Sequence, residues 1–189
     1  KKAPVPPRAW NVREIPPEVA AVAFPRISDE DLAEIAECPE AVGRSWKAGE
    51  RLFRTGDRDV PFFIILSGEV EILDESGPEP QTIVVHDRGK FTGEVGWLSG
   101  ARAIASAVAK TDAETYAFSQ ANLRELINLA PNLGDVILTA LITRRQLLKE
   151  SGVSADRVVS RWEPYPSGVP AFVLERAKAP DGRYFYALG

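Results

Sequence analysis

The sequence predicts an α+β fold, an antiparallel β-roll (a jelly-roll-like barrel) with one N-terminal helix and two C-terminal helices. Segments with the period of short strands, separated by turn signals, are confined to the middle of the chain, and helical spacing of apolar residues is confined to their flanks. Prolines crowd both ends of the chain. The predicted roll therefore occupies residues 25–150, between a Pro-rich arm at 1–24 and an extension at 151–189.

The elements follow from local signals. A helix is predicted to begin at Ser28, where a capping serine precedes acidic residues and apolar residues at helical spacing, and to end near Pro39. The strands are predicted at 50–54, 62–72 with a tight spot at Gly68, 81–86, 103–109 and 114–118, with a hairpin loop at 74–80 and an irregular stretch at 89–100. Two helices, 121–129 and about 132–149, separated by Pro131, close the domain.

Composition excludes several kinds of chemistry. The net charge of −4 argues against a surface that coats nucleic acid, and it means that a bound anion must be neutralised locally. The single cysteine, Cys38, excludes an internal disulfide and a Cys-rich zinc module. The single histidine, His86, ends an apolar strand pattern, where we expect it to face solvent or bond a neighbour. Without a nucleophile–base pair, a metal cluster or a phosphate-transfer loop, no enzyme, metal or cofactor is expected.

The location of the protein is predicted from its apolar segments. No stretch approaches the roughly 18 consecutive apolar residues of a membrane span, and prolines rather than an apolar segment follow Lys1 and Lys2. No methionine is present, even at position 1, which suggests a processed or trimmed chain. These patterns predict a cytoplasmic protein with no membrane partner.

One segment, FTGEVGWLSGAR at residues 91–102, carries a candidate binding site. Its glycines permit close approach of the backbone, and a single helical turn from Glu94 would point free N–H groups at an anion, with Arg102 adding a charged contact. This arrangement suits a phosphate whose ribose also meets a carboxylate. On spacing alone, a barrel turn in which Glu94 and Arg102 are solvated or paired is the favoured interpretation.

In the context of its neighbours, the segment resembles the cyclic nucleotide-binding domain family. The motifs stand in the family's order: GERLFRTGD at 49–57, FFIILSGEV at 62–70, the phosphate cassette, and then two helices. The resemblance covers roughly Phe24 to Gly152 and implies an eight-stranded β-roll that binds cAMP or cGMP. It also implies that the last helix forms a lid or a dimer seam, so we expect a homodimer through about 132–149.

The resemblance assigns roles to cassette residues. Glu94 would accept the ribose 2′-hydroxyl, neighbouring backbone would meet the sugar-phosphate, and Arg102 would hold the cyclic phosphate. The predicted site residues are Gly93, Glu94, Val95, Gly96, Arg102, Ala103 and Ser106.

The sequence departs from the family at the arginine. The usual pattern reads Gly-x-Pro-Arg-Ala-Ala-Thr, and alignment on Gly100 places Ala103 at the arginine position and Ser106 at the threonine position. Arg102 is thus displaced by one residue. On a strand this would send the side chain to the opposite face, whereas in a loop before the strand Arg102 could still reach inward.

Other features are interpreted as structural. Phe62, Phe63 and Ile64 are expected in the core, Trp97 is expected to pack under the roll, and Arg144 with Arg145 is expected on a solvated face.

Two functions remain open: a sensor of a cyclic nucleotide, and a degenerate roll kept as a protein-interaction or assembly module. Motifs near both ends of the domain also resemble modules placed ahead of bacterial thioredoxin-reductase-like flavoproteins, although no dinucleotide fingerprint is present. Family members that bind DNA add a winged helix-turn-helix, for which residues 153–189 are too few, so no nucleic-acid partner is expected. A hairpin is predicted at 171–186 instead.

Overall fold

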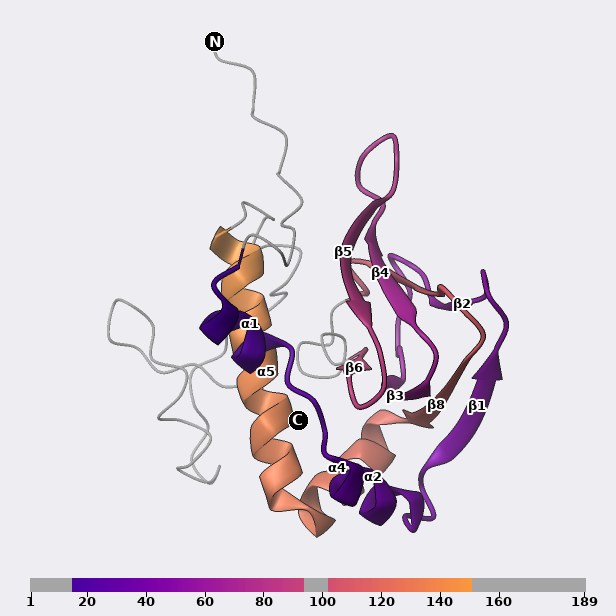
Figure 1. Cartoon of the computed structure of the whole chain (residues 1–189), viewed down its shortest axis with the longest axis vertical. Coiled ribbons are helices and arrows are strands. Elements are labelled where there is room, and N and C mark those ends of the chain that lie inside the picture. Colours follow the sequence, from indigo (N-terminus) through magenta and orange to yellow (C-terminus); the bar gives the residue numbers. More distant parts are fainter. Residues whose placement is uncertain (1–14, 94–101, 151–189) are drawn as a thin grey trace.

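The computed structural model describes residues 15–93 and 102–150. In these ranges it contains two antiparallel four-stranded sheets and four helices (Figure 1). In chain order the elements are α1 (Pro17–Ala23), α2 (Asp29–Ala36), β1 (Val42–Trp46), β2 (Arg51–Phe53), β3 (Phe62–Ser67), β4 (Val70–Asp74), β5 (Gln81–His86), β6 (Phe91–Thr92), β7 (Ser106–Ala109), β8 (Ala113–Phe118), α4 (Gln120–Leu129) and α5 (Pro131–Glu150). The hairpin predicted at 171–186 lies outside the described residues.

The strands confirm the predicted antiparallel arrangement. One sheet has the order β1-β8-β3-β6 and the other the order β2-β7-β4-β5. Buried side chains of both sheets, among them Phe63, Ile65, Val70 and Ile72, form one core cluster between them. Because β1 and β2 are edge strands, as are β6 and β5, each sheet leaves two edges along which a binding groove can open.

Strand β3 is buried on both faces. Phe62 and Ile64 belong to a cluster with the helices, whereas Phe63 and Ile65 belong to the cluster between the sheets. A strand covered on both sides needs a continuous apolar run rather than alternation. The expectation that Phe62, Phe63 and Ile64 are core residues is confirmed.

The helices that cover one sheet begin at the predicted signals. The Ser28 hydroxyl accepts the N–H of Asp31 at 3.0 Å, and Ser119 caps α4 in the same way. Pro131 begins α5, since a proline in the first helical turn removes an N–H that would have no partner. Figure 1 shows α2 and α4 below the sheets, and α5 running upward from α4 beside α1.

Two helices precede β1, whereas the sequence predicted one. The additional helix is α1, which forms within the arm predicted to be extended. Pro16 and Pro17 start this helix instead of preventing it, because Pro17 occupies its first position and Glu18 follows in the first turn. Helix α1 lies against α5 (Figure 1).

Strand β1 was not anticipated by the sequence pattern. Four of its five residues are exposed and it contains Gly43, so it shows no apolar alternation. It exists because its backbone pairs with β8 from Val42–Ala117 to Trp46–Ala113. The strand predicted at 103–109 is regular only from Ser106.

The apolar positions of α5 are used mainly within the chain. Leu133, Ile137 and Ala140 belong to the cluster with α2, α4 and β3, and Leu141 is also buried. Among the α5 side chains that the structure describes, the large apolar one that remains exposed is Val136, at 38%. The helix predicted as a dimer seam is thus first a core element of its own protomer.

Candidate functional site

The first end of the cassette is held tightly against β3. Gly93 follows β6 with φ of +91°, and a Cβ atom at this position would overlap the carbonyl oxygen of Pro61. Strand β6 itself pairs with Phe63 and Ile64. Only glycine fits this conformation and this close approach without strain. Glu94, Val95 and Gly96 lie outside the described residues.

The second end of the cassette is bound to the connection between β2 and β3. Arg102 is exposed, and its Nη1 donates to the carbonyl oxygen of Gly56 at 2.9 Å. The N–H of Ala103 donates to the carbonyl of Asp57 at 2.9 Å, and the Ala103 carbonyl accepts the N–H of Gly56 at 2.7 Å. Both ends of the cassette therefore lie against residues 56–61.

The direction of the side chains differs between Arg102 and Ala103. Ala105, Ala107 and Ala109 lie in the cluster between the sheets, and Ala103 packs against that cluster. This packing turns the family's arginine position, Ala103, towards the interior. The guanidinium of Arg102 lies at the surface.

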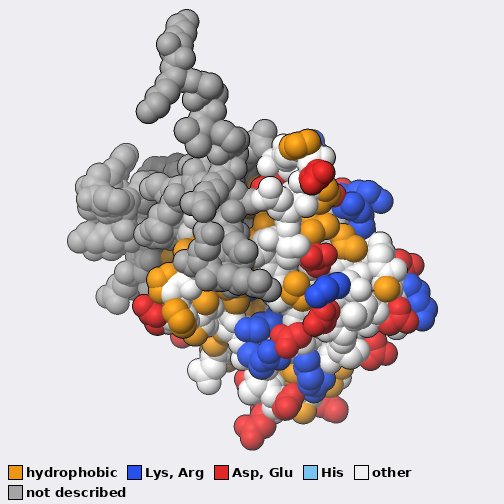
Figure 2. All heavy atoms as spheres, turned by 45° about the horizontal axis from the view of Figure 1, so that its top comes forward, with side chains coloured by type: hydrophobic (Ala, Val, Ile, Leu, Met, Phe, Trp, Pro, Cys, Tyr) orange, Lys and Arg blue, Asp and Glu red, His pale blue; other side chains and the backbone are white. Residues whose placement is uncertain are grey.

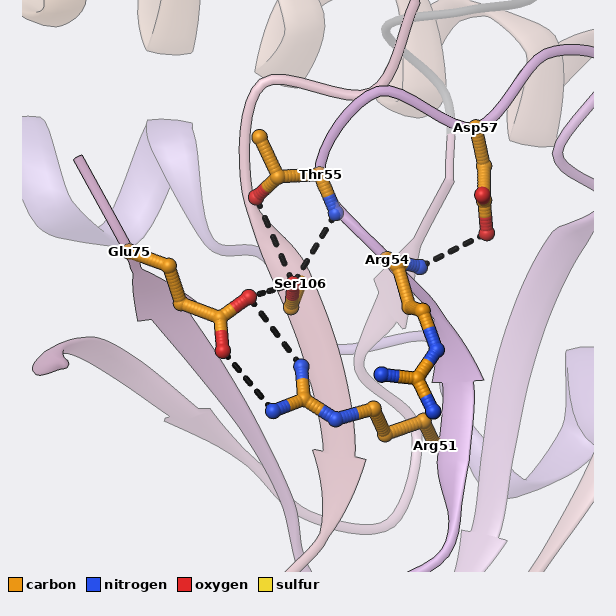
Figure 3. Close-up of polar contacts among 6 residues, drawn as sticks. All are labelled: Arg51, Arg54, Thr55, Asp57, Glu75 and Ser106. Carbon is orange, nitrogen blue, oxygen red and sulfur yellow. Dashed lines mark hydrogen bonds and ion pairs between the residues drawn. The ribbon is translucent and has the colours of Figure 1, made fainter.

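Ser106 belongs to a partly buried polar network with Thr55, Glu75 and Arg51, which Figure 3 shows. Its side chain is fully buried, donates to the Glu75 carboxylate and accepts the N–H of Thr55 at 2.9 Å. Arg51 donates to both oxygens of Glu75, at 3.1 and 2.8 Å. These hydrogen bonds, that of Arg51 first and that of Ser106 second, lower the pKa of Glu75 to about 2.

Sequence reasoning did not find Arg51 or Glu75. Arg51 lies in a short strand and Glu75 in a hairpin loop, and 24 positions separate them, so no spacing links them. Arg54 adds positive potential beside Glu75, and its backbone N–H donates to Asp57 at 2.8 Å.

A groove of about 750 Å³ runs along the edge strands β1 and β2. Its lining includes Arg44, Arg51 and Arg54 together with the carboxylates of Glu50 and Asp57. Strand β1 is the edge opposite to β6 in its sheet. The groove still reaches the second end of the cassette, because Asp57 lines it and the Asp57 carbonyl accepts the N–H of Ala103.

The structure corrects the expected solvent exposure of two basic residues. His86 does not face solvent: it is 2% exposed, and its Nδ1 has no hydrogen-bond partner among the described residues. Arg144 is 5% exposed; its Nε donates to the carbonyl of Ala23 at 2.6 Å and its Nη1 to that of Phe91 at 3.3 Å. The Arg144 guanidinium lies 4.9 Å from the centre of the Phe24 ring and 4.7 Å from that of Phe91. Packing between two aromatic rings explains why this arginine leaves the solvent.

Neither a metal centre nor a membrane segment is found in residues 15–93 and 102–150. No group of three or more His, Cys, Asp or Glu side chains is placed there to hold a metal ion. None of the helices in these ranges combines the length and the apolar content that crossing a bilayer requires.

The comparison with protein families supports a cyclic nucleotide-binding domain. The model of that family, described as "Cyclic nucleotide-binding domain", matches residues 43–129, which run from β1 to the end of α4. Domains of this family are typically regulatory. No curated protein matches the sequence.

Solved structures show the same fold. The catabolite activator protein of Thermus thermophilus aligns with a TM-score of 0.55 and 26% identity over 71% of this chain and 62% of that protein. The c-di-GMP-responsive regulator CLP of Xanthomonas campestris aligns with a TM-score of 0.54 and 19% identity over 69% and 64%. The regulatory subunit of a cAMP-independent protein kinase A from Trypanosoma cruzi, bound to guanosine, aligns with a TM-score of 0.51 and 20% identity over 67% and 44%. The chain thus spans less than two thirds of each of these proteins.

Proposed function

We propose that residues 25–150 form a regulatory domain that senses cAMP or cGMP through the phosphate cassette and the site residues predicted between Gly93 and Ser106. The observation that carries the proposal is the anchoring of both cassette ends, at Gly93 and at Arg102, on the connection between β2 and β3. The family match over 43–129 supports the same site. In this proposal Glu94 accepts the ribose hydroxyl and Arg102 binds the phosphate.

A local cation is required for this function. The net charge of the chain is −4, and Figure 2 shows Lys and Arg side chains interspersed with Asp and Glu on the face that it draws. An anionic ligand is therefore attracted by individual cations and not by a broad basic surface. Arg102 is the only Lys or Arg between Lys90 and Lys110.

Calorimetric titration of the full chain with cAMP and with cGMP tests the proposal. Loss of a charge-paired arginine costs about 2–5 kcal/mol, so Arg102→Ala should weaken binding by about thirty-fold or more. Arg124→Ala is the matched control, because it removes an exposed arginine charge from α4, outside both the cassette and the groove. Equal affinity of wild type and Arg102→Ala would show that the assigned site is wrong.

One observation favours a second candidate function, a nucleotide-free module for protein interaction or assembly. Ala103 stands where the family places arginine and packs against the interior, whereas Arg102 lies at the surface. Titration distinguishes the two functions. If wild type binds neither nucleotide at millimolar concentration, which corresponds to about 4 kcal/mol, the second function replaces the first.

Further properties are proposed with this function. We infer a non-enzymatic, cytoplasmic regulator that forms a homodimer through α5 and has no nucleic-acid or membrane partner. The exposed Val136 on α5 supports the homodimer. The likeness to modules that precede bacterial flavoproteins stays a prediction from the sequence.

A further inference from the structure

The only histidine of the chain is enclosed by elements that are distant in sequence. His86 is the last residue of β5, and its ring centre lies 6.0 Å from that of Phe24, which follows α1. The guanidinium of Arg144, on α5, also lies over the Phe24 ring, and the charges of Arg144 and of Lys90, which precedes β6, act on the imidazole. The imidazole is therefore covered by the docked α5 and by the segment around Phe24.

Two cations hold this cover in place. Arg144 donates to the carbonyls of Ala23 and Phe91, and the Lys90 ammonium donates to the carbonyl of Phe24. These bonds join α5, the segment after α1 and strand β6. Water can reach His86 only if the cover lifts, because the residue is 2% exposed.

The enclosure suits a neutral imidazole and not an imidazolium. An imidazolium has two N–H donors, and the buried Nδ1 has no acceptor among the described residues. Burial, followed by the charges of Arg144 and Lys90, holds the pKa of His86 well below its ordinary value of 6.5. The neighbouring carboxylate, Asp87, is exposed and forms two 2.8 Å bonds with Arg26.

We propose that His86 makes the docking of α5 sensitive to acid. The docked helix accepts only the neutral imidazole, so protonation of His86 releases α5 and the Phe24 segment from the roll. The proposal does not depend on nucleotide binding, because none of the predicted ligand-binding residues takes part in it.

The single histidine makes the first test direct. The imidazole gives one set of side-chain NMR resonances, and their titration in the full wild-type chain reports this group alone. The resonances should show a pKa well below 6.5. A titration at 6.5 or above would overturn the proposal, whatever happens to any variant.

Hydrogen exchange of α5 tests the release. We take His86 to be protonated only when α5 is released, with the ordinary pKa of 6.5 in that state. The released state is then about thirty-fold more populated at pH 5.0 than at pH 7.5. Amides of α5 in wild type should therefore lose protection by about this factor, after correction for intrinsic exchange. His86→Phe, which fills the site with an uncharged ring, should show no such loss.

A second variant serves as the control for the acid response of α5. Glu75→Gln should leave the acid response of α5 unchanged, because Glu75 titrates at about pH 2, below the window. If acid lowers α5 protection equally in wild type and in His86→Phe, or in neither, His86 is not the switch. If His86→Phe does not fold, His86→Leu replaces it in the same comparison.

Discussion

Replacement of Arg144 by methionine tests how strongly α5 is fixed to the roll. Methionine keeps an unbranched stem but removes the guanidinium, and with it two hydrogen bonds and two ring contacts. The carbonyls of Ala23 and Phe91 then lose a charged donor at a site that is 5% exposed. Arg144→Met should therefore destabilise the folded state far more than loss of a surface charge.

The size of the effect follows from these contacts. A hydrogen bond from a charged group contributes about 1.5–3 kcal/mol, and a cation–π contact about 0.5–2 kcal/mol. Part of this gain offsets the cost of burying the guanidinium, so we expect a net loss of about 3–5 kcal/mol, as for other broken buried charges. For a chain of this size, each kcal/mol lowers Tm by about 2–4 °C. Arg144→Met should melt at least about 6 °C below wild type.

Thermal and urea unfolding, followed by circular dichroism, measure this difference. Arg124→Met is the matched control, because Arg124 is exposed on α4 and the same substitution there should change Tm by no more than about 2 °C. The variant should also raise the pKa of His86, since Arg144 is one of the charges that lower it. Equal melting of Arg144→Met and Arg124→Met would refute the reasoning.

Four further outcomes are expected. Gly93→Ala should lower stability by about 2 kcal/mol or more in urea unfolding because of its φ and the overlap with Pro61, whereas Gly43→Ala, with open space around it, should not. The double variant Arg102→Ala/Ala103→Arg should bind cyclic nucleotide in calorimetry about tenfold or more tightly than Arg102→Ala, because position 103 faces the interior. Val136→Asp should lower the mass measured by light scattering if α5 is a dimer seam, and an unchanged dimer would exclude this face. The pKa of Glu75 is lowered, so its contribution to stability is complete above about pH 4.5 and is lost as the pH falls towards 2; Glu75→Gln should remove this acid dependence of Tm.

Much of the fold was predictable because its signals are local. The caps at Ser28 and Ser119, the break at Pro131 and the apolar run of β3 each lie within a few residues of the structure that they determine. In contrast, β1 is defined by pairing with β8, some 70 positions away, and its exposed residues carry no pattern of their own. A strand that is stabilised mainly by pairing with one partner strand need not show apolar alternation in its own sequence.

The candidate site stays a prediction, and the structure places only its two ends. Gly93 was expected to let the backbone approach a ligand, and in the structure it lies close to the carbonyl of Pro61. The directions of Arg102 and Ala103 depend on backbone bonds to Gly56 and Asp57, which no sequence spacing reveals. The buried state of His86 was also hidden, because its cover comes from α5 and from the segment before α2.

Strand β6 connects the two proposals, because it contacts α5, which acid would release, and leads into the cassette, which a ligand would occupy. The carbonyl of Phe91 accepts Arg144 of α5, and Gly93, two residues later, begins the cassette. A ligand that binds only the docked form, at 100 times its Kd, would stabilise that form by about 2.7 kcal/mol. Since one pH unit corresponds to about 1.36 kcal/mol for a single titrating group, such a ligand would shift the acid release of α5 lower by about two pH units. A shift of this size in the exchange of α5 would connect the two proposals, and its absence in the presence of a bound nucleotide would separate them.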